Sequence, residues 1–384
     1  MSKKKQGTAL GQIVAGTSLN LDEFEIPEAP AQREKRHYDN LHLQGEQRTE
    51  RRYVDCHFSS VTLEACHFKT LHFERCVMDN VRLVACNISE FTLTGCDVKR
   101  LVVTDCLVNQ CLFQTGSQQQ IAWRNSVIDG ISVHQQRVES LQMHEVQLAR
   151  WSALESSFSQ LEVRDSVFND AGWFNSRLQA SRWLGGSVLR QAMSGCTLDE
   201  VTYQGTRGSH LVWNDCRLSQ VNLANMSLSG ASFLGAQLSR CDMSGCNLSQ
   251  VTFTRAQLND CRLNQANLTL CQAEDAGFTT CDLSGAQMRH ARLNGALLAQ
   301  CLVDGGDFTG ADLRAANVRD TPFHAVIGRG EMRVHGAQGA LTEGAPAEPL
   351  LMQIDAWYQR NQPGLPETSP WSPGKSLNGG SRYV

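Results

Sequence analysis

The stretch Cys241-Asp-Met-Ser-Gly-Cys-Asn-Leu-Ser-Gln250 contains two copies of one five-residue unit, and this unit continues on both sides of it. Within the surrounding sequence, cysteines recur every twenty residues, at Cys241, Cys261, Cys281 and Cys301. A period of five inside a period of twenty is neither the 3.6 of a helix nor the 2 of an alternating strand. Such a fixed internal period indicates a repeat architecture.

The five-residue frame extends far beyond this stretch. Every fifth residue from Tyr53 to Phe323 occupies the same central position, and of these 55 positions only Gln118 and Gly208 are not hydrophobic. All fifteen cysteines lie two residues before a centre. No insertion or deletion shifts the frame, so the repeat predicts one elongated body rather than several globular domains.

The pattern predicts the shape of this body. The centre and the residue two before it should face a dry interior, and the other three residues of each unit should face water. Four such units close a square coil of twenty residues, and stacked coils pair like β-strands at a spacing of about 4.8 Å. We therefore predict an all-β solenoid of about 13 coils, in which Cys241, Cys261, Cys281, Cys301, Leu263 and Leu283 form a structural core ladder.

The frame also predicts how the chain is organised. Residues 1–40 are polar and should be a flexible or capping tail. Residues 41–323 form the solenoid, with a distorted coil or small loop at 114–120 and an irregular part at 121–215, where tryptophans crowd the interior. Residues 324–384 are rich in glycine and proline, with a short helix at 349–360.

That C-terminal helix should carry an apolar face. Because a solenoid exposes an apolar cross-section at each end, terminal caps are needed. The face could cap the last coil, bury it against a second copy in a homodimer through the solenoid end, or dock to another protein; these alternatives stay open. Its residues are Leu350, Leu351, Ile354, Trp357 and Tyr358.

Composition limits the cellular setting. The net charge of −4 implies no strong polyelectrolyte partner. No run of eighteen apolar residues predicts a membrane span, and the N-terminus does not resemble a signal peptide. We expect a protein of the reducing cytoplasm with free cysteines. Export by a dedicated secretion machine stays open.

Reactive side chains show no catalytic or metal-binding arrangement in the sequence. No cysteine pair has CxxC spacing, and each thiol occupies an inward position, so we predict neither a metal site nor a cofactor. Histidines such as His57, His134 and His290 occupy outward positions without a nucleophile and base at matching spacing. A smooth solenoid also offers no deep cleft, so we expect no enzymatic activity.

Charged residues form columns at twenty-residue spacing. Arg124, His144 and Arg164 share one outward column, next to a column with Asp105, Glu145 and Asp165. We expect ladder salt bridges between these two columns. Arg137, Arg177 and Arg217 recur at every second coil and could meet phosphates. However, residues 53–323 contain 26 acidic against 21 basic residues, so nucleic-acid binding is disfavoured.

The units Ala266-Asn267-Leu268 and Ala311-Asp312-Leu313 resemble the consensus of the pentapeptide-repeat proteins, and the resemblance covers residues 53–323. It implies a right-handed quadrilateral β-helix and says little about function. Some long bacterial relatives look like accessory or adaptor proteins of type VI-like secretion systems. The resemblance thus favours a non-catalytic protein-interaction scaffold of this kind. A DNA mimic that binds a type II topoisomerase and a translocated effector remain as alternatives.

Overall fold

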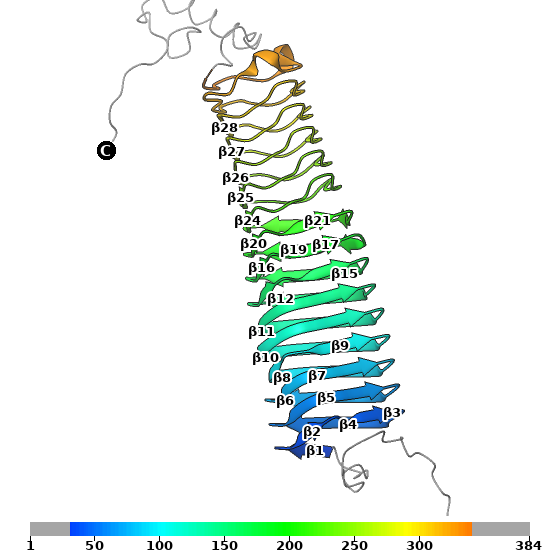
Figure 1. Ribbon diagram of the computed structural model, residues 1–384. Coiled ribbons are helices and arrows are strands. Elements are labelled where there is room, and N and C mark those ends of the chain that lie inside the picture. The colour runs from blue at the N-terminus through cyan, green and yellow to red at the C-terminus, as the bar shows by residue number, and fades with distance from the viewer. Residues whose placement is uncertain (1–30, 340–384) are drawn as a thin grey trace, which may run out of the picture.

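The computed structural model describes residues 31–339, which form a single four-sided β-solenoid (Figure 1). Residues twenty apart pair in parallel: Phe58 pairs with Met78, Trp183 with Tyr203, and Leu258 with Phe278. The predicted all-β quadrilateral solenoid of about 13 coils is confirmed. Figure 1 shows the corners of successive coils in long, gently curved lines, so each side of the solenoid is a continuous face.

The strands are longest in the N-terminal half. They are β1 (Ala31–Glu34), β2 (His37–Asp39), β3 (His42–Gln44), β4 (Gln47–Val54), β5 (His57–Glu64), β6 (His67–Glu74), β7 (Val77–Val84), β8 (Asn87–Val98), β9 (Leu101–Thr104), β10 (Leu107–Arg124), β11 (Val127–His144), β12 (Gln147–Leu154), β13 (Ser157–Ser159), β14 (Glu162–Arg164) and β15 (Val167–Phe174).

Further along the chain the strands shorten to three or four residues. They are β16 (Arg177–Gln179), β17 (Arg182–Leu184), β18 (Ser187–Leu189), β19 (Gln191–Ser194), β20 (Thr197–Asp199), β21 (Thr202–Gln204), β22 (Arg207–Ser209), β23 (Val212–Asn214), β24 (Arg217–Ser219), β25 (Gln237–Ser239), β26 (Gln257–Asn259), β27 (Gly277–Thr279) and β28 (Leu297–Ala299). The 3-10 turns η2 (Phe323–Ala325) and η3 (Arg329–Glu331) follow.

The size of the side chain two residues before each centre, the second inward position, changes together with the strand length. Large or β-branched residues such as Val61 and Phe91 hold this position in the first coils and favour extended strands. In the last coils alanine or cysteine holds it at most positions, and many of these residues close a local turn with their N–H: the Ala266 N–H donates to the Leu263 carbonyl at 3.1 Å. Three sides of these coils are therefore turns linked by single β-bridges, and the fourth side keeps strands β24 to β28.

The corners of the coils require an uncommon backbone conformation. The residue two positions after a centre takes a positive φ, for example 61° at Gln265 and 63° at Gly245. Glycine adopts this left-handed region without cost, and asparagine and aspartate tolerate it better than most residues. This explains why small and polar residues recur at every fifth position.

The described solenoid extends beyond the expected limits of 41 and 323. Strand β1 pairs with β4, and Tyr38 stacks on Phe58 at 4.9 Å, so coiling already includes residues 31–40. At the other end, Ile327 bridges to Asp307 and Met332 is buried. Tyr38 continues the frame before the predicted range, and beyond it Met332 takes an inward place after one extra residue has shifted the frame. The predicted helix at 349–360 lies outside the described residues.

Residues 114–120, expected to form a distorted coil or a small loop, belong to the continuous strand β10, which is locally distorted at Gly116. Gly116 pairs with Cys96 on one side and Gln136 on the other, and Gln118 is buried at a central position. The pairing register is therefore intact, although the side chains of this segment are polar. Gly116 makes this possible, because at φ 119° a Cβ atom would lie 2.3 Å from the Cys96 carbonyl oxygen.

Gly116→Ala should therefore lower the free energy of unfolding by about 2–4 kcal/mol, since both the backbone clash and the positive φ oppose a side chain. Urea denaturation followed by circular dichroism measures the change. Gly130→Ala is the matched control, because its Cβ would meet no atom closer than 3.8 Å. Equal stability of the two variants would contradict this account of β10.

The middle coils bury polar atoms that have no hydrogen-bond partner among the described residues. Both polar atoms of the Gln136 side chain are of this kind, as are the indole nitrogens of four tryptophans: Trp151, Trp173, Trp183 and Trp213. The twenty-residue register nevertheless continues through this region, as the pairing of Trp183 with Tyr203 shows. Each unsatisfied group lowers stability, so these coils should be less stable than their apolar volume suggests.

Gln136→Met should raise the free energy of unfolding by about 1–2 kcal/mol, because methionine keeps the volume and removes the unpaired amide. Thermal and urea unfolding test this expectation. Gln142→Met, at an exposed position of the next side, should change stability by less than about 0.5 kcal/mol. A destabilised Gln136→Met variant would show that the amide has a partner.

Candidate interaction surfaces

The core ladder lies where the frame places it. Cys241, Cys261, Cys281, Cys301, Leu263 and Leu283 are all buried. Each of these thiols donates to carbonyl oxygens of its own and the preceding coil, as from Cys281 Sγ to the Leu258 oxygen at 3.4 Å. Residues 31–339 contain no cluster of three or more His, Cys, Asp or Glu side chains arranged for a metal ion.

The cysteines outside the main ladder are equally shielded. Burial raises the pKa of Cys246 to about 11 and that of Cys271 to about 12. A thiol is nucleophilic only as the thiolate, so these two residues are unreactive at neutral pH. The chemistry available to a partner must therefore come from the outward side chains.

The expected ladder between the 124–164 and 105–165 columns forms only in part. His144 lies 3.9 Å from Glu145, but Arg164 pairs with Glu162 at 3.3 Å instead of with the neighbouring column. Asp105 accepts a hydrogen bond from Asn125. Side chains within one strand or one column are closer than those across a corner, and this proximity decides the pairing.

The second arginine set forms a spaced row. Arg137, Arg177 and Arg217 lie on one side, separated by Ser157 and Thr197 in the intervening coils. Arg217 donates to the Gln237 side chain at 3.3 Å. Two coil spacings separate neighbouring arginines by about 9.6 Å, which is too far apart to enclose one small anion.

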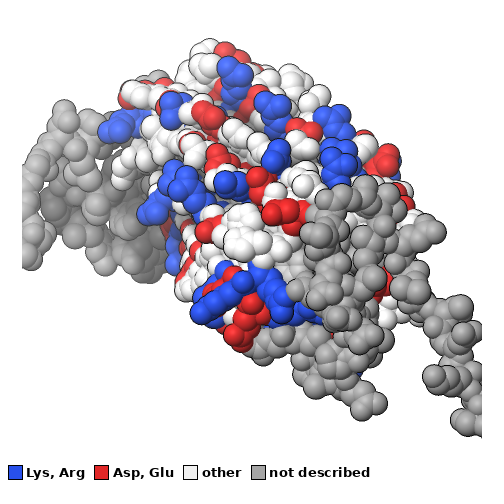
Figure 2. Space-filling model, turned by 60° about the horizontal axis from the view of Figure 1, so that its bottom comes forward, with Lys and Arg blue, Asp and Glu red and all other residues white. Residues whose placement is uncertain are grey.

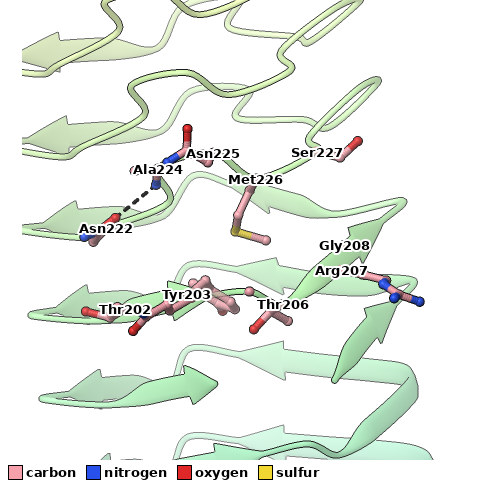
Figure 3. Close-up of a pocket in the computed structure, with 12 residues that line it drawn as sticks. Thr202, Tyr203, Thr206, Arg207, Gly208, Asn222, Ala224, Asn225, Met226 and Ser227 are labelled. Atoms are coloured by element: carbon pink, nitrogen blue, oxygen red, sulfur yellow. Dashed lines mark hydrogen bonds between the residues drawn. The ribbon is translucent and has the colours of Figure 1, made fainter. Parts of the chain in front are cut away.

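A surface depression of about 810 Å³ lies beside Gly208 (Figure 3). Gly208 has no side chain at a central position that Val188 and Leu228 fill in the neighbouring coils, and Met226 reaches toward the gap. The buried Thr206 hydroxyl has no partner there. Arg207 is the charged residue of its lining, so the depression contains no acid–base pair for catalysis.

One side of the solenoid has an uncharged surface over nine consecutive coils. On this side, which we call the neutral face, two outward side chains per coil alternate with inward ones. None of the eighteen is Asp, Glu, Lys or Arg. They are Thr92, Thr94, Leu112, Gln114, Ser132, His134, Ser152, Leu154, Gly172, Phe174, Ala192, Ser194, Val212, Asn214, Ser232, Leu234, Thr252 and Thr254.

Phe174 is the largest side chain at the middle of the neutral face. Its side chain is 43 % exposed, although most phenylalanines in the described chain are buried. Its ring lies over Gly172, where a Cβ would come within 3.0 Å of the ring. An exposed aromatic residue among small neutral neighbours is typical of the centre of a protein interface.

Charged pairs border the neutral face. At its N-terminal end Arg52 pairs with Glu74 at 2.6 Å, and at its C-terminal end Arg314 pairs with Asp312 at 2.7 Å. Along one edge Arg150 pairs with Asp129 and Arg190 with Asp170, both at 2.5 Å. Over the same coils every other side carries at least two charged outward residues, such as Asp129 and Arg207.

The neutral face is not apparent from columns of charge in the sequence. Its signal is a missing charge over nine coils together with an aromatic residue at an outward frame position. The predicted docking or capping residues Leu350, Leu351, Ile354, Trp357 and Tyr358 lie outside the described residues and remain a prediction. Within residues 31–339, no helix is long and apolar enough to span a bilayer.

Comparisons with known proteins agree with the repeat. A family model described as pentapeptide repeats (8 copies) matches residues 216–255, and one described as pentapeptide repeat region matches 251–324. None of the curated proteins compared with the sequence matches it significantly.

Two solved structures of pentapeptide-repeat type are similar. HetL, a pentapeptide repeat protein involved in heterocyst differentiation regulation in the cyanobacterium Nostoc sp. strain PCC 7120, is 20 % identical; the match covers 55 % of this chain and 86 % of HetL, with a TM-score of 0.35. A trypsin-treated variant of QnrB1, a plasmid-mediated fluoroquinolone resistance protein, is 16 % identical; the match covers 52 % of this chain and 97 % of QnrB1, with a TM-score of 0.34. Similarity this low says nothing about what the present chain binds.

Proposed function

Because this chain is a pentapeptide-repeat protein with an unbroken solenoid, we propose that it is a non-catalytic scaffold that binds protein through an outward face. The observation that supports this function best is the neutral face with Phe174 at its middle. Desolvating uncharged side chains costs little, whereas burying unpaired charges is expensive. Among the four sides of the solenoid, this face is therefore the least costly to cover with a partner.

The arrangement of reactive groups supports a non-catalytic role. Nucleophilic thiols are buried, and the histidine–carboxylate contacts of the described residues lie on the surface, as His42 with Glu64 at 2.8 Å and His72 with Glu74 at 4.0 Å. A base needs a nucleophile or substrate group within hydrogen-bond reach. No serine, threonine or cysteine side chain of residues 31–339 forms a hydrogen bond with either of these histidines.

The finer role within this proposal is that of an accessory or adaptor protein of a bacterial, type VI-like secretion system that works in the cytoplasm. The long regular body and the non-repeat segments at both ends favour such a role by analogy of architecture. A translocated effector would share these features. Comparing the amount of the protein in culture supernatant with that in cells separates the two roles.

A DNA mimic that binds a topoisomerase is the second candidate, and the surface charge weighs against it. Figure 2 shows acidic and basic side chains interspersed over the visible surface rather than a continuous acidic surface. A mimic of the DNA backbone needs one sign of charge along its length. A DNA supercoiling assay with micromolar protein should therefore show no effect on gyrase, and strong inhibition or protection would replace our proposal.

Affinity purification from native lysate, followed by mass spectrometry, tests the scaffold proposal. The tagged full-length protein and Leu302→Glu should both retain at least one protein in stoichiometric amount, and Phe174→Glu should lose it. An untagged second copy of this chain counts as such a protein. Leu302 is the matched control because it is 56 % exposed on another side. If the wild type retains no protein, or if all three baits retain the same set, the neutral face is not a binding surface.

A further inference from the structure

We infer that the partner of the neutral face is a second copy of this chain, packed face to face and antiparallel. The inference rests on the proposed function, because it names the partner of that same face. In such an isologous dimer, a two-fold axis runs along the strand direction, midway between the coils of Gly172 and Ala192. The residues of each outward column then face residues of the same column in the other copy, and the two columns run in opposite directions.

Charge at the two ends of the face supports this register. The axis brings Arg52 of one copy opposite Asp312 of the other, and the same pair forms again at the far end. Arg52 already pairs with Glu74 and Asp312 with Arg314, so the contact joins two ion pairs into a network of alternating sign. Electrostatic complementarity of this kind selects orientation and register.

A change of register by one coil, which moves the axis by half a coil toward the N-terminus, opposes like charges. Arg52 would then face Arg292, and Glu74 would face Glu274 at the same column position. In the inferred register Arg292 instead faces His72, whose pKa is lowered by burial and by the nearby Arg52 against the effect of Glu74. His72 is therefore neutral at pH 7 and does not repel Arg292, while the adjacent Glu74 attracts it.

Shape at the middle of the face fits the same arrangement. The Phe174 ring faces Ser194 of the other copy, and Gly172 faces Ala192. Ala192 and Ser194 are small and exposed, so the two rings, one from each copy, have room to insert beside the axis. Packed sheets interdigitate in this way, with large side chains opposite small ones.

The size of the contact matches that of a stable interface. From the coil of Arg52 to that of Asp312 the face is about 62 Å long, at about 4.8 Å per coil. Four residues between corners make it about 13 Å wide, at about 3.3 Å per residue. Each copy would bury about 800 Å², the usual contribution of one partner to a specific interface.

Charge reversal in separate chains tests the inference directly. Sedimentation velocity and light scattering of the purified full-length protein should give twice the monomer mass at about 10 μM. Arg52→Asp and Asp312→Arg should each weaken dimerisation at least about tenfold. An equimolar mixture of these two variants should recover it, because Arg52→Asp of one copy then meets Asp312→Arg of the other, and the native pair forms at the opposite end.

Two further variants locate the contact. Phe174→Glu should be monomeric, and Leu302→Glu should dimerise like the wild type. Three results would overturn the inference. They are a monomeric wild type, a mixture that dimerises as weakly as either charge-reversal variant alone, and a dimer that survives Phe174→Glu but is lost in Ile354→Glu. The last result would place the contact at the residues around Ile354 instead. A monomeric wild type that still retains another protein through Phe174 would refute this dimer and leave the scaffold function standing.

Discussion

Leu263→Asp should lower the free energy of unfolding by about 4–5 kcal/mol, the largest effect expected for a single substitution in this protein. Leu263 is fully buried between Met243 and Leu283 in the inward stack, and none of these neighbours can pair with a carboxylate. The introduced carboxyl would lose its hydration and leave a cavity where the leucine had packed. Urea denaturation followed by circular dichroism measures the loss.

The loss of stability caused by Leu263→Asp should depend on pH in a defined direction. Burial disfavours the charged form, so the folded-state pKa of the introduced carboxyl lies above its unfolded value of about 3.9. Destabilisation grows as pH rises from about 4 toward the folded-state pKa and shrinks as pH falls below it. The difference in the free energy of unfolding between variant and wild type should therefore be smaller at pH 4 than at pH 8.

Asn264→Asp is the matched control for this substitution. Position 264 is the next residue along the chain and faces outward, between Ser244 and Ser284 of the neighbouring coils. Asn264→Asp should change the free energy of unfolding by less than about 0.5 kcal/mol. If Leu263→Asp unfolded at the same urea concentration as this control, position 263 would not lie inside the solenoid.

One residue inserted after Ser244 should unfold the coils that follow it and leave those before it intact. The insertion moves Arg262 into the inward place of Leu263 and turns every later centre toward water. Each coil contacts only its neighbours, so the damage should not spread far toward the N-terminus. Hydrogen exchange with mass spectrometry should show lost protection after about residue 245 and retained protection before about residue 220.

Tryptophan fluorescence provides a second readout for the insertion. The five tryptophans of the described residues lie between Trp123 and Trp213, before the insertion, so their buried emission should persist while circular dichroism falls. An insertion after Gly330 is the control. The chain already accommodates one extra residue there, because Asp307 bridges to Ile327, twenty residues on, but Asp312 bridges to Arg333, twenty-one residues on. Protection retained throughout the first variant would contradict the twenty-residue coil.

Most of the fold is determined by local sequence. A centre every five residues decides which side chains point inward, because backbone alternation and a corner residue repeat identically in each unit. The ladder of Cys241, Cys261, Cys281 and Cys301 thus fixed four sides per coil, and the structure places all four thiols inside. Residues 114–120 form a distorted coil rather than a loop, because register is held by both neighbouring coils, which outweighs a run of polar side chains.

The candidate site could not be predicted in the same way. Which charges pair depends on distances across a corner, and Arg164 joins Glu162 instead of the neighbouring column. The neutral face consists of residues twenty apart, and its meaning appears only when Phe174 is seen over Gly172 and charged pairs are seen at both ends. The sequence by itself therefore determined the interior, since burial there follows a one-dimensional period. The tertiary structure decided the surface, since coil stacking alone brings distant outward residues together.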